Sequence, residues 1–140
     1  MKLPAKLGLG LVGVLALSQA IRPDHTNPAG TGEIQAPADV AKVLQRACYD
    51  CHSNQTTWPW YSQIAPVSWL VARDVNEGRR HLNFSVWDSY EPAKKAKKLE
   101  HVASEVKEGE MPMAIYVPMH PEAKLTEADR ALLIAWAQQP

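Results

Sequence analysis

Apolar residues along this chain follow the spacing of helices rather than that of strands. Four stretches place apolar side chains three and four residues apart, which puts them on one face of a helix. They predict helices from Pro37 into Cys48, over 67–77, over 92–108 and from Thr126 onwards. Because no stretch alternates apolar and polar residues as a half-buried strand does, we predict an all-α fold.

Turn-forming residues predict where these helices begin and end. Pro92 suits a first helical position, whereas Gly78 and Gly109 are expected to end the second and third helices. Thr126, with Asp129 three residues later, matches a capping box. The last helix is therefore predicted to begin directly after Thr126.

A basic start followed by an apolar run predicts export. Lys2 and Lys6 precede uncharged, mostly apolar residues that continue to Ile21, which is the order found in secretory leaders. Residues 18–20, Ser-Gln-Ala, would serve as a small-x-small cleavage site. The run is shorter than the roughly 20 residues of a transmembrane helix, yet it could remain as a tilted anchor.

These features divide the chain into three parts. Residues 1–21 are expected to form an N-terminal apolar helix that is a signal peptide or a membrane anchor. Residues 22–35 read as a linker, and residues 36–140 as the folded domain. Since a basic flank stays in the cytoplasm, the domain is expected in the periplasm or on the outer face of the cytoplasmic membrane.

The charge balance argues against a nucleic-acid partner. The 140 residues include 15 Lys and Arg against 15 Asp and Glu, so no global field attracts an anionic polymer. The basic run at 94–98, Lys-Lys-Ala-Lys-Lys, is interpreted first as the solvated face of a helix and second as a partner site. Only two cysteines are present, and their close spacing indicates local chemistry.

The segment Cys48-Tyr49-Asp50-Cys51-His52 carries the strongest chemical signal. Its spacing on a helical turn puts two thiols and an imidazole on one face. The thiols can add to the vinyl groups of haem while the imidazole reaches the iron, and Cys-x-x-Cys-His is the attachment sequence of c-type haem. We therefore predict one covalent haem c with His52 as the proximal ligand. Its other ring nitrogen is expected to bond a backbone carbonyl in the loop 58–66.

Three other kinds of site use a similar pair of cysteines. A thioredoxin-like redox pair expects a preceding strand, where this chain predicts a helix. A zinc site needs a fourth ligand and spaced donors, whereas Cys51 and His52 are adjacent. A disulfide between Cys48 and Cys51 would close a loop too short to stabilise much, and it leaves His52 without a role. Covalent haem is therefore the leading interpretation.

The second axial position of the iron decides what such a site can do. A protein ligand favours electron transfer, whereas an open position favours binding of small molecules. Met111 ranks first, because it follows the predicted helix end in a proline-containing loop, and Met113 is its competitor. The other downstream candidates are Met119, His81, His101 and His120.

Aromatic residues gather after the motif, in the turn-rich segment 54–66 and beyond it. They could pack around a porphyrin and offer N–H or O–H groups to its carboxylates, or they could simply form the core. These residues are Trp58, Trp60, Tyr61, Trp69 and Trp87.

Several short motifs occur in an order that resembles a known family. They are Ile34-Gln35-Ala36-Pro37, Cys48 to Asn54, Trp58-Pro59-Trp60-Tyr61, Ile64 to Leu70, His81 to Ser85, Gly109-Glu110-Met111-Pro112 and His120 to Leu125. The family is that of the haem-binding-domain proteins with a single Cys-x-x-Cys-His motif, which are similar to class I cytochromes c. The resemblance implies one haem c, a helical cytochrome c-like fold with packed terminal helices, and a Met-Pro loop whose sixth ligand maps onto Met111. Met113-Ala114-Ile115 departs from the proline or aromatic residue expected there.

These features together predict a mono-haem c-type cytochrome, an electron carrier rather than an enzyme. It would pass single electrons between redox partner proteins that bind transiently, with no nucleic-acid partner. Residues 7–21 would serve as a membrane tether if they are not cleaved. The alternative is a haem ligand-binding sensor or a peroxidase-accessory domain with an open distal site.

Overall fold

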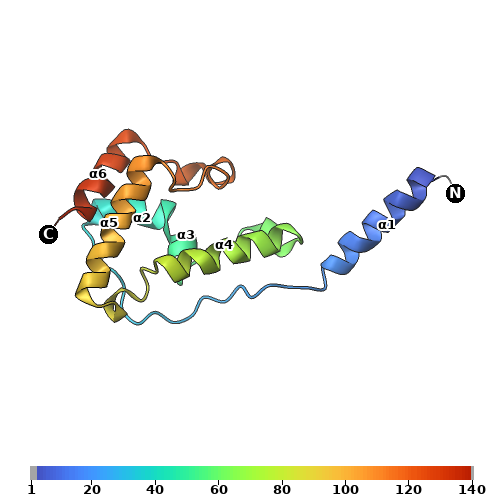
Figure 1. Ribbon diagram of the computed structural model, residues 1–140, viewed down its shortest axis with the longest axis horizontal. Helices are drawn as coiled ribbons and strands as arrows, with labels where there is room; N and C mark the ends of the chain where they lie inside the picture. Colours follow the sequence, from blue (N-terminus) through green and yellow to red (C-terminus); the bar gives the residue numbers. More distant parts are fainter. Residues whose placement is uncertain (1–2, 140) are drawn as a thin grey trace.

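The computed structural model describes residues 3–139, and its regular elements are helices (Figure 1). Among these residues there is no β-strand, and an isolated bridge joins Gly32 and Val86. The all-α prediction is therefore confirmed. The α-helices are α1 (Leu3–Ser18), α2 (Ala38–Ala47), α3 (Tyr49–His52), α4 (Val67–His81), α5 (Pro92–Glu108) and α6 (Glu127–Ala137). Short 3₁₀ turns are η1 (Trp60–Gln63), η2 (Trp87–Ser89), η3 (Val117–Met119) and η4 (Pro121–Ala123).

The core lies where α2, α5 and α6 meet, and Figure 1 shows these three helices gathered at one end of the molecule. Leu44 of α2, Leu133 of α6 and Phe84, which follows α4, are almost completely buried. Burying side chains of this size stabilises a fold by roughly 1.5–3 kcal/mol each relative to leaving them exposed. The N-terminal helix of the domain thus packs against its C-terminal helix, as expected.

The start of α6 is fixed by the predicted capping box. Thr126 Oγ1 accepts a hydrogen bond of 3.1 Å from Asp129 N, and Asp129 Oδ2 accepts one of 2.8 Å from Thr126 N. Arg46 of α2 also contacts this carboxylate, with 2.7 Å between Nη2 and Oδ2. The hydrogen bond from Arg46, aided by those from Thr126, lowers the pKa of Asp129 to about 2. One carboxylate therefore both caps α6 and ties it to α2.

The predicted end of the second helix is wrong. Helix α4 continues through Gly78 and ends at His81. Gly78 is needed for packing rather than for a stop, because a Cβ atom built there would lie 2.4 Å from the carbonyl oxygen of Cys51. The glycine lets α4 lie directly against the cysteine segment. Gly109, by contrast, ends α5 as predicted, with a left-handed φ of 79°.

Residues 22–35, expected to be a linker, lie along the domain. The Ile34 amide donates a hydrogen bond of 3.0 Å to the Phe84 carbonyl, and the Ile34 side chain is buried in the core. Arg79 of α4 donates to the Thr26 carbonyl and to Asn27 Oδ1, at 3.0 and 2.7 Å. This irregular segment is thus held to the folded part.

Helix α1 lies apart from this core (Figure 1). Its side chains from position 4 to position 17 are exposed, and they are mostly apolar. No helix among residues 3–139 is both long enough and apolar enough to cross a membrane.

Candidate functional site

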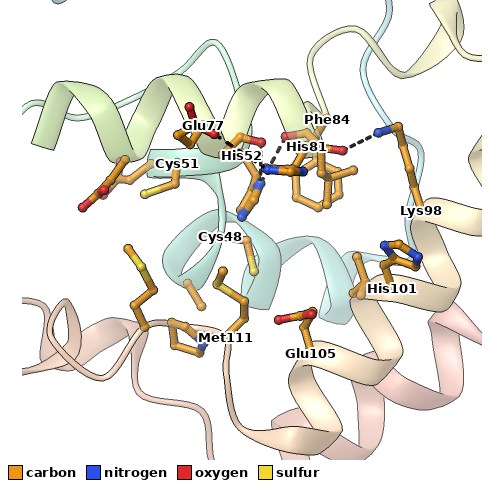
Figure 2. A pocket seen from close by; sticks show the side chains of 18 of the residues that line it. Cys48, Cys51, His52, Glu77, His81, Phe84, Lys98, His101, Glu105 and Met111 are labelled. Carbon is orange, nitrogen blue, oxygen red and sulfur yellow. Dashed lines mark hydrogen bonds and ion pairs between the residues drawn. The ribbon is translucent and has the colours of Figure 1, made fainter. Parts of the chain in front are cut away.

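A cavity of about 710 Å³ opens between the cysteine segment, α4, α5 and the loop after α5. Its volume falls within the range of roughly 300–1,000 Å³ that is usual for small-molecule sites. Figure 2 shows side chains that enter it from opposite sides, with His52 on one side and Met111 on the other. The cavity is therefore a site bounded by two faces of the protein.

The cysteine segment occupies one wall. Cys48 lies at the junction of α2 and α3, and its carbonyl accepts hydrogen bonds from the amides of Cys51 and His52, at 3.3 and 2.9 Å. This single turn brings both thiols and the imidazole to the cavity. The grouping expected from the spacing is thus present, and neither cysteine forms a disulfide.

The ring of His52 is oriented by two backbone carbonyls. Its Nδ1 lies 3.0 Å from Gly78 O and 3.1 Å from Leu82 O, so Nδ1 carries the proton and donates. That tautomer leaves the lone pair of Nε2 available, on the ring that points into the cavity (Figure 2). Burial lowers the pKa of His52 and so favours this neutral form, despite the two carbonyls.

The prediction that the His52 partner lies in the loop 58–66 is wrong. The carbonyls come from the C-terminal turn of α4 and the residue after it, and the Gly78 carbonyl also accepts a hydrogen bond of 2.8 Å from the Leu82 amide. The close approach at Gly78 brings these carbonyls within reach of the imidazole. One packing contact thus places and orients the proposed iron ligand.

Both thiols are protonated at neutral pH. Burial, followed by the proximity of Cys51, raises the pKa of Cys48 to about 12. Burial, followed by the charge of Asp50, raises the pKa of Cys51 to about 11. Because the thiolate is the reactive form in thiol–disulfide exchange, this environment disfavours a redox pair that cycles through a disulfide.

Two methionines line the opposite wall. Met111 and Met113 both border the cavity and are half-buried. The Met111 amide donates a hydrogen bond of 3.3 Å to the Glu105 carbonyl, which ties this loop to the end of α5. Met119, in contrast, is 58% exposed and does not line the cavity. The structure thus narrows the methionine candidates to two.

The histidine candidates separate in a similar way. His120 lies outside the lining, where its Nε2 is 2.6 Å from Tyr61 Oη. His81 and His101 both reach the border of the cavity but remain exposed. Their exposure is that of solvated side chains.

None of the five aromatic residues expected near the cofactor lines the cavity. Trp58 packs at a tilt against His25, with 4.2 Å between ring centroids, and Tyr61 forms a hydrogen bond with His120. Trp60 is 70% exposed, and Trp69 Nε1 donates to the Ile21 carbonyl. Trp87 is buried in the hydrophobic core. Trp60 and Tyr61 belong to η1, which packs against α4.

Phe84 and Tyr116 are the aromatic residues that do line the cavity. Tyr116 Oη donates a hydrogen bond of 2.6 Å to Asp50 Oδ2, and burial and this bond raise the pKa of the phenol. The Tyr116 ring also stacks on His120, with 4.0 Å between centroids. One signal in the sequence points to Tyr116, namely its place in the same loop as the methionines.

One face of α5 brings positive charge to the cavity. Lys94, Lys97 and Lys98 line it, whereas Lys95 turns towards Asp88. Among residues 3–139, none of the three cavity lysines forms an ion pair with a carboxylate. Burial, followed by the charge of Lys94, lowers the pKa of Lys98, as expected where cations crowd together.

Comparison with protein families assigns the chain to one of them. Residues 8–139 match the model of the family described as haem-binding domain. The chain belongs to the haem-binding-domain family. Searches of curated proteins and of solved structures found no match. The resemblance noted from the sequence motifs is thereby confirmed, and the protein is assigned as a haem protein.

The residues of the cavity fit a haem. The cavity offers an oriented imidazole lone pair on one side, thioethers on the other, and apolar walls such as Phe84 and Val106. Two cysteines border the same space, and lysines without carboxylate partners among residues 3–139 can meet the carboxylates of the cofactor. This set of residues suits an iron porphyrin with two acidic side chains.

Proposed function

We propose that this chain is a mono-haem c-type cytochrome that passes single electrons between partner proteins and transforms no substrate. The observation that carries the proposal is that His52 lies across one cavity from the loop between α5 and η3. This loop contains Met111 and Met113 and is called the methionine loop below. His52 Nδ1 is fixed by two carbonyls, and Met111 approaches from the other side (Figure 2). An iron with two protein ligands stays six-coordinate, which suits electron transfer rather than ligand binding.

Covalent attachment would use the thiols of Cys48 and Cys51. Each S–H would add across one vinyl group, so that a sulfur–carbon bond forms and the hydrogen moves to the neighbouring carbon. The addition consumes no oxidant or reductant. The raised pKa values of the two thiols agree with this role, because they keep the cysteines protonated and hinder their oxidation to a disulfide beforehand.

The chain would hold the cofactor with several further groups. His52 and Met111 are the proposed axial ligands, and Met113 is the competitor on the distal side. Lys94, Lys97 and Lys98 are the cations available to the carboxylates. When bound, haem supplies an iron that gains or loses one electron at a time. The protein's part is to fix the two ligands and to exclude water around them, which sets the potential.

The proposed location is supported by the N-terminal segment. A basic start and an apolar helix support a domain outside the cytoplasmic membrane, either released after cleavage or tethered through residues 7–21. Transient docking of redox partners is expected there, because electron carriers must release each partner after transfer.

Visible spectra of the protein made in a host that matures c-type cytochromes test this proposal. The haem should stay on the chain in a denaturing gel, and the reduced protein should have the sharp bands of a low-spin iron. Met111→Ala should convert the oxidised haem to a high-spin or differently ligated state. Met119→Ala is the matched control, since Met119 is exposed and outside the cavity, and its spectrum should not change.

Three results would contradict parts of the proposal. Haem that is lost in the gel would exclude covalent attachment. A changed spectrum in Met113→Ala, with Met111→Ala unaffected, would move the sixth ligand to Met113. Fast and complete carbon monoxide binding by the reduced wild-type protein would favour the sensor or peroxidase-accessory alternative.

A further inference from the structure

Exposed apolar side chains surround the end of α4 that begins at Val67. Trp60 is 70% exposed, Leu70 54% and Ile64 47%, and Val67 and Trp69 are exposed as well. These five residues, the α4 tip, come from η1, the first turns of α4 and the residues between. Single exposed apolar residues are ordinary on soluble proteins, but a cluster of this kind marks an interaction surface.

The α4 tip is bonded to the end of α1. The side-chain amide of Gln19, just after α1, donates to the Ala65 carbonyl at 3.1 Å and accepts from the Ala65 amide at 3.0 Å. Trp69 Nε1 donates to the Ile21 carbonyl at 2.8 Å. In Figure 1 the same end of α4 points towards α1. Whatever surrounds α1 therefore also lies close to the α4 tip.

The occupant of α1 is indicated by its uniform apolar surface. From Leu7 to Ile21 the chain has no charged residue, and large apolar side chains on all sides of the helix are exposed, among them Leu9 (66%), Leu11 (62%) and Val12 (62%). A groove on a protein covers one stripe of a helix, whereas lipid hydrocarbon covers every side. Lipid is thus the partner that this helix fits.

The length of α1 then determines where the domain sits. Its 16 residues reach about 24 Å at a rise of about 1.5 Å per residue. The hydrocarbon core of a bilayer is about 30 Å thick. A helix this short buries all of its apolar side chains only when the segment at its end is drawn to the membrane surface. That segment is bonded to the α4 tip.

We propose that the α4 tip rests on the surface of a lipid bilayer, with Trp60 and Trp69 in the headgroup region. Indole rings favour this region because they combine an apolar body with one polar N–H group. Contact at a second point would fix the domain's orientation, so that the haem cavity faces a defined direction above the membrane. The proposal rests on the proposed location beside a membrane, but it does not depend on electron transfer.

Photocrosslinking of the full-length haem-loaded chain tests this contact. The protein is placed in phosphatidylcholine vesicles that contain a phosphatidylcholine with a diazirine near the glycerol end of an acyl chain. After illumination, mass spectrometry maps the lipid adducts. Adducts are expected on residues 60–70 in addition to those on α1. The double variant Trp60→Ser/Leu70→Ser should reduce the adducts on residues 60–70 at least several-fold and leave those on α1 unchanged.

The control is Ile115→Ser, because Ile115 is 81% exposed but belongs to the methionine loop rather than to the tip. This change should leave the adducts on residues 60–70 as they are. Adducts confined to α1, a chain that does not float with the vesicles, or crosslinks to a second chain at residues 60–70 would overturn the proposal. Unchanged visible spectra in all variants establish that they are folded. Spectra that show an open distal haem position would contradict the proposed electron transfer. They would not affect the lipid contact, which the crosslinking tests independently.

Discussion

The hydroxyl of Tyr116 donates a hydrogen bond of 2.6 Å to Oδ2 of Asp50, and this bond joins the two walls of the cavity. Asp50 lies between the two cysteines, and Tyr116 follows the methionines in their loop. The other oxygen of Asp50 accepts from the Thr57 amide at 2.9 Å, so the carboxylate is itself held in place. The position of the methionine loop over the cavity therefore depends on a contact with the cysteine segment, Cys48 to His52.

Tyr116→Phe should loosen that loop while leaving the ring stacked on His120. A hydrogen bond to a charged group contributes about 1.5–3 kcal/mol, so the free energy of unfolding should fall by roughly that amount. In a looser loop the methionine would be detached from the iron for a larger fraction of the time. Carbon monoxide should therefore bind the reduced protein faster. Urea unfolding and stopped-flow mixing measure the two effects.

Tyr90→Phe is the control for this change. The Tyr90 hydroxyl accepts a hydrogen bond of 3.1 Å from the Asn83 amide, far from the methionine loop in the sequence. The variant should lose stability without a change in the carbon monoxide rate. If both variants bind carbon monoxide at the wild-type rate, Tyr116 does not hold the distal loop.

Gly78→Ala should damage the site even though alanine is the better helix former. In an open helix this change adds about 1 kcal/mol of stability. At position 78, however, the new methyl group would lie 2.4 Å from the Cys51 carbonyl, so α4 must move away. That movement withdraws the carbonyls that orient His52. We expect lower stability, less haem incorporated per chain and a shifted spectrum.

Gly109→Ala provides a contrast, because nothing lies within 4 Å of a Cβ atom there. Its φ of 79° makes alanine unfavourable by about 1 kcal/mol. It should therefore lower the free energy of unfolding with little effect on the haem spectrum. Equal spectra for both glycine variants would argue against the packing role of Gly78.

The contrast between these two glycines indicates what the sequence could and could not predict. Helix spacing and the capping box at Thr126 are local signals, so the helices, the end of α5 and the grouping of Cys48, Cys51 and His52 were all predictable. Gly78 also resembles a local stop signal. Its role comes from the crossing of α3 and α4, which no local pattern records.

The same limit explains why the positions of the aromatic residues could not be predicted from the sequence. Trp58 and Trp60 lie within nine residues of Cys51, yet neither lines the cavity, and η1, which contains Trp60, packs against α4. Tyr116 comes much later in the chain and lies beside Asp50. Proximity in sequence was a poor guide because the direction of a loop depends on tertiary packing. The lysines of α5 are similar, since only the packing of that helix decides which of them face the cavity.

Lys97→Gln should lower the reduction potential. A positive charge near the haem stabilises the reduced form, which carries one positive charge less, so removal of the charge favours oxidation. At an effective dielectric constant near 40 and a separation of about 10 Å, the effect is ~0.8 kcal/mol, or about 35 mV for one electron. Potentiometric titration measures it, and the shift should shrink at high ionic strength.

Lys95→Gln is the matched control, because Lys95 belongs to the same basic run but points towards Asp88, with 3.8 Å between Nζ and Oδ1. Its potential should change by much less than that of Lys97→Gln. If both variants shift the reduction potential equally, the basic run at 94–98 is simply the solvated face of α5.

Asp129→Asn should reveal a pH-dependent link between α2 and α6. The hydrogen bond from Arg46, with those from Thr126, lowers the pKa of Asp129 from 3.8 to about 2. A carboxyl whose pKa is lower in the folded state contributes stability above its unfolded pKa and loses it as the pH falls through its folded pKa. The contribution of Asp129 is therefore complete above about pH 4 and mostly lost near pH 2.

The variant should thus be less stable than the wild type by about 1 kcal/mol near neutral pH, as is typical for loss of a cap. The difference should shrink between pH 4 and pH 2, where the wild-type carboxyl becomes protonated. Urea unfolding followed by helical circular dichroism at a series of pH values measures it. Glu127→Gln, in the same first turn of α6, serves as the control and should show a smaller loss. A difference for Asp129→Asn that stays constant down to pH 2 would mean that the carboxylate charge does not hold α6 to α2.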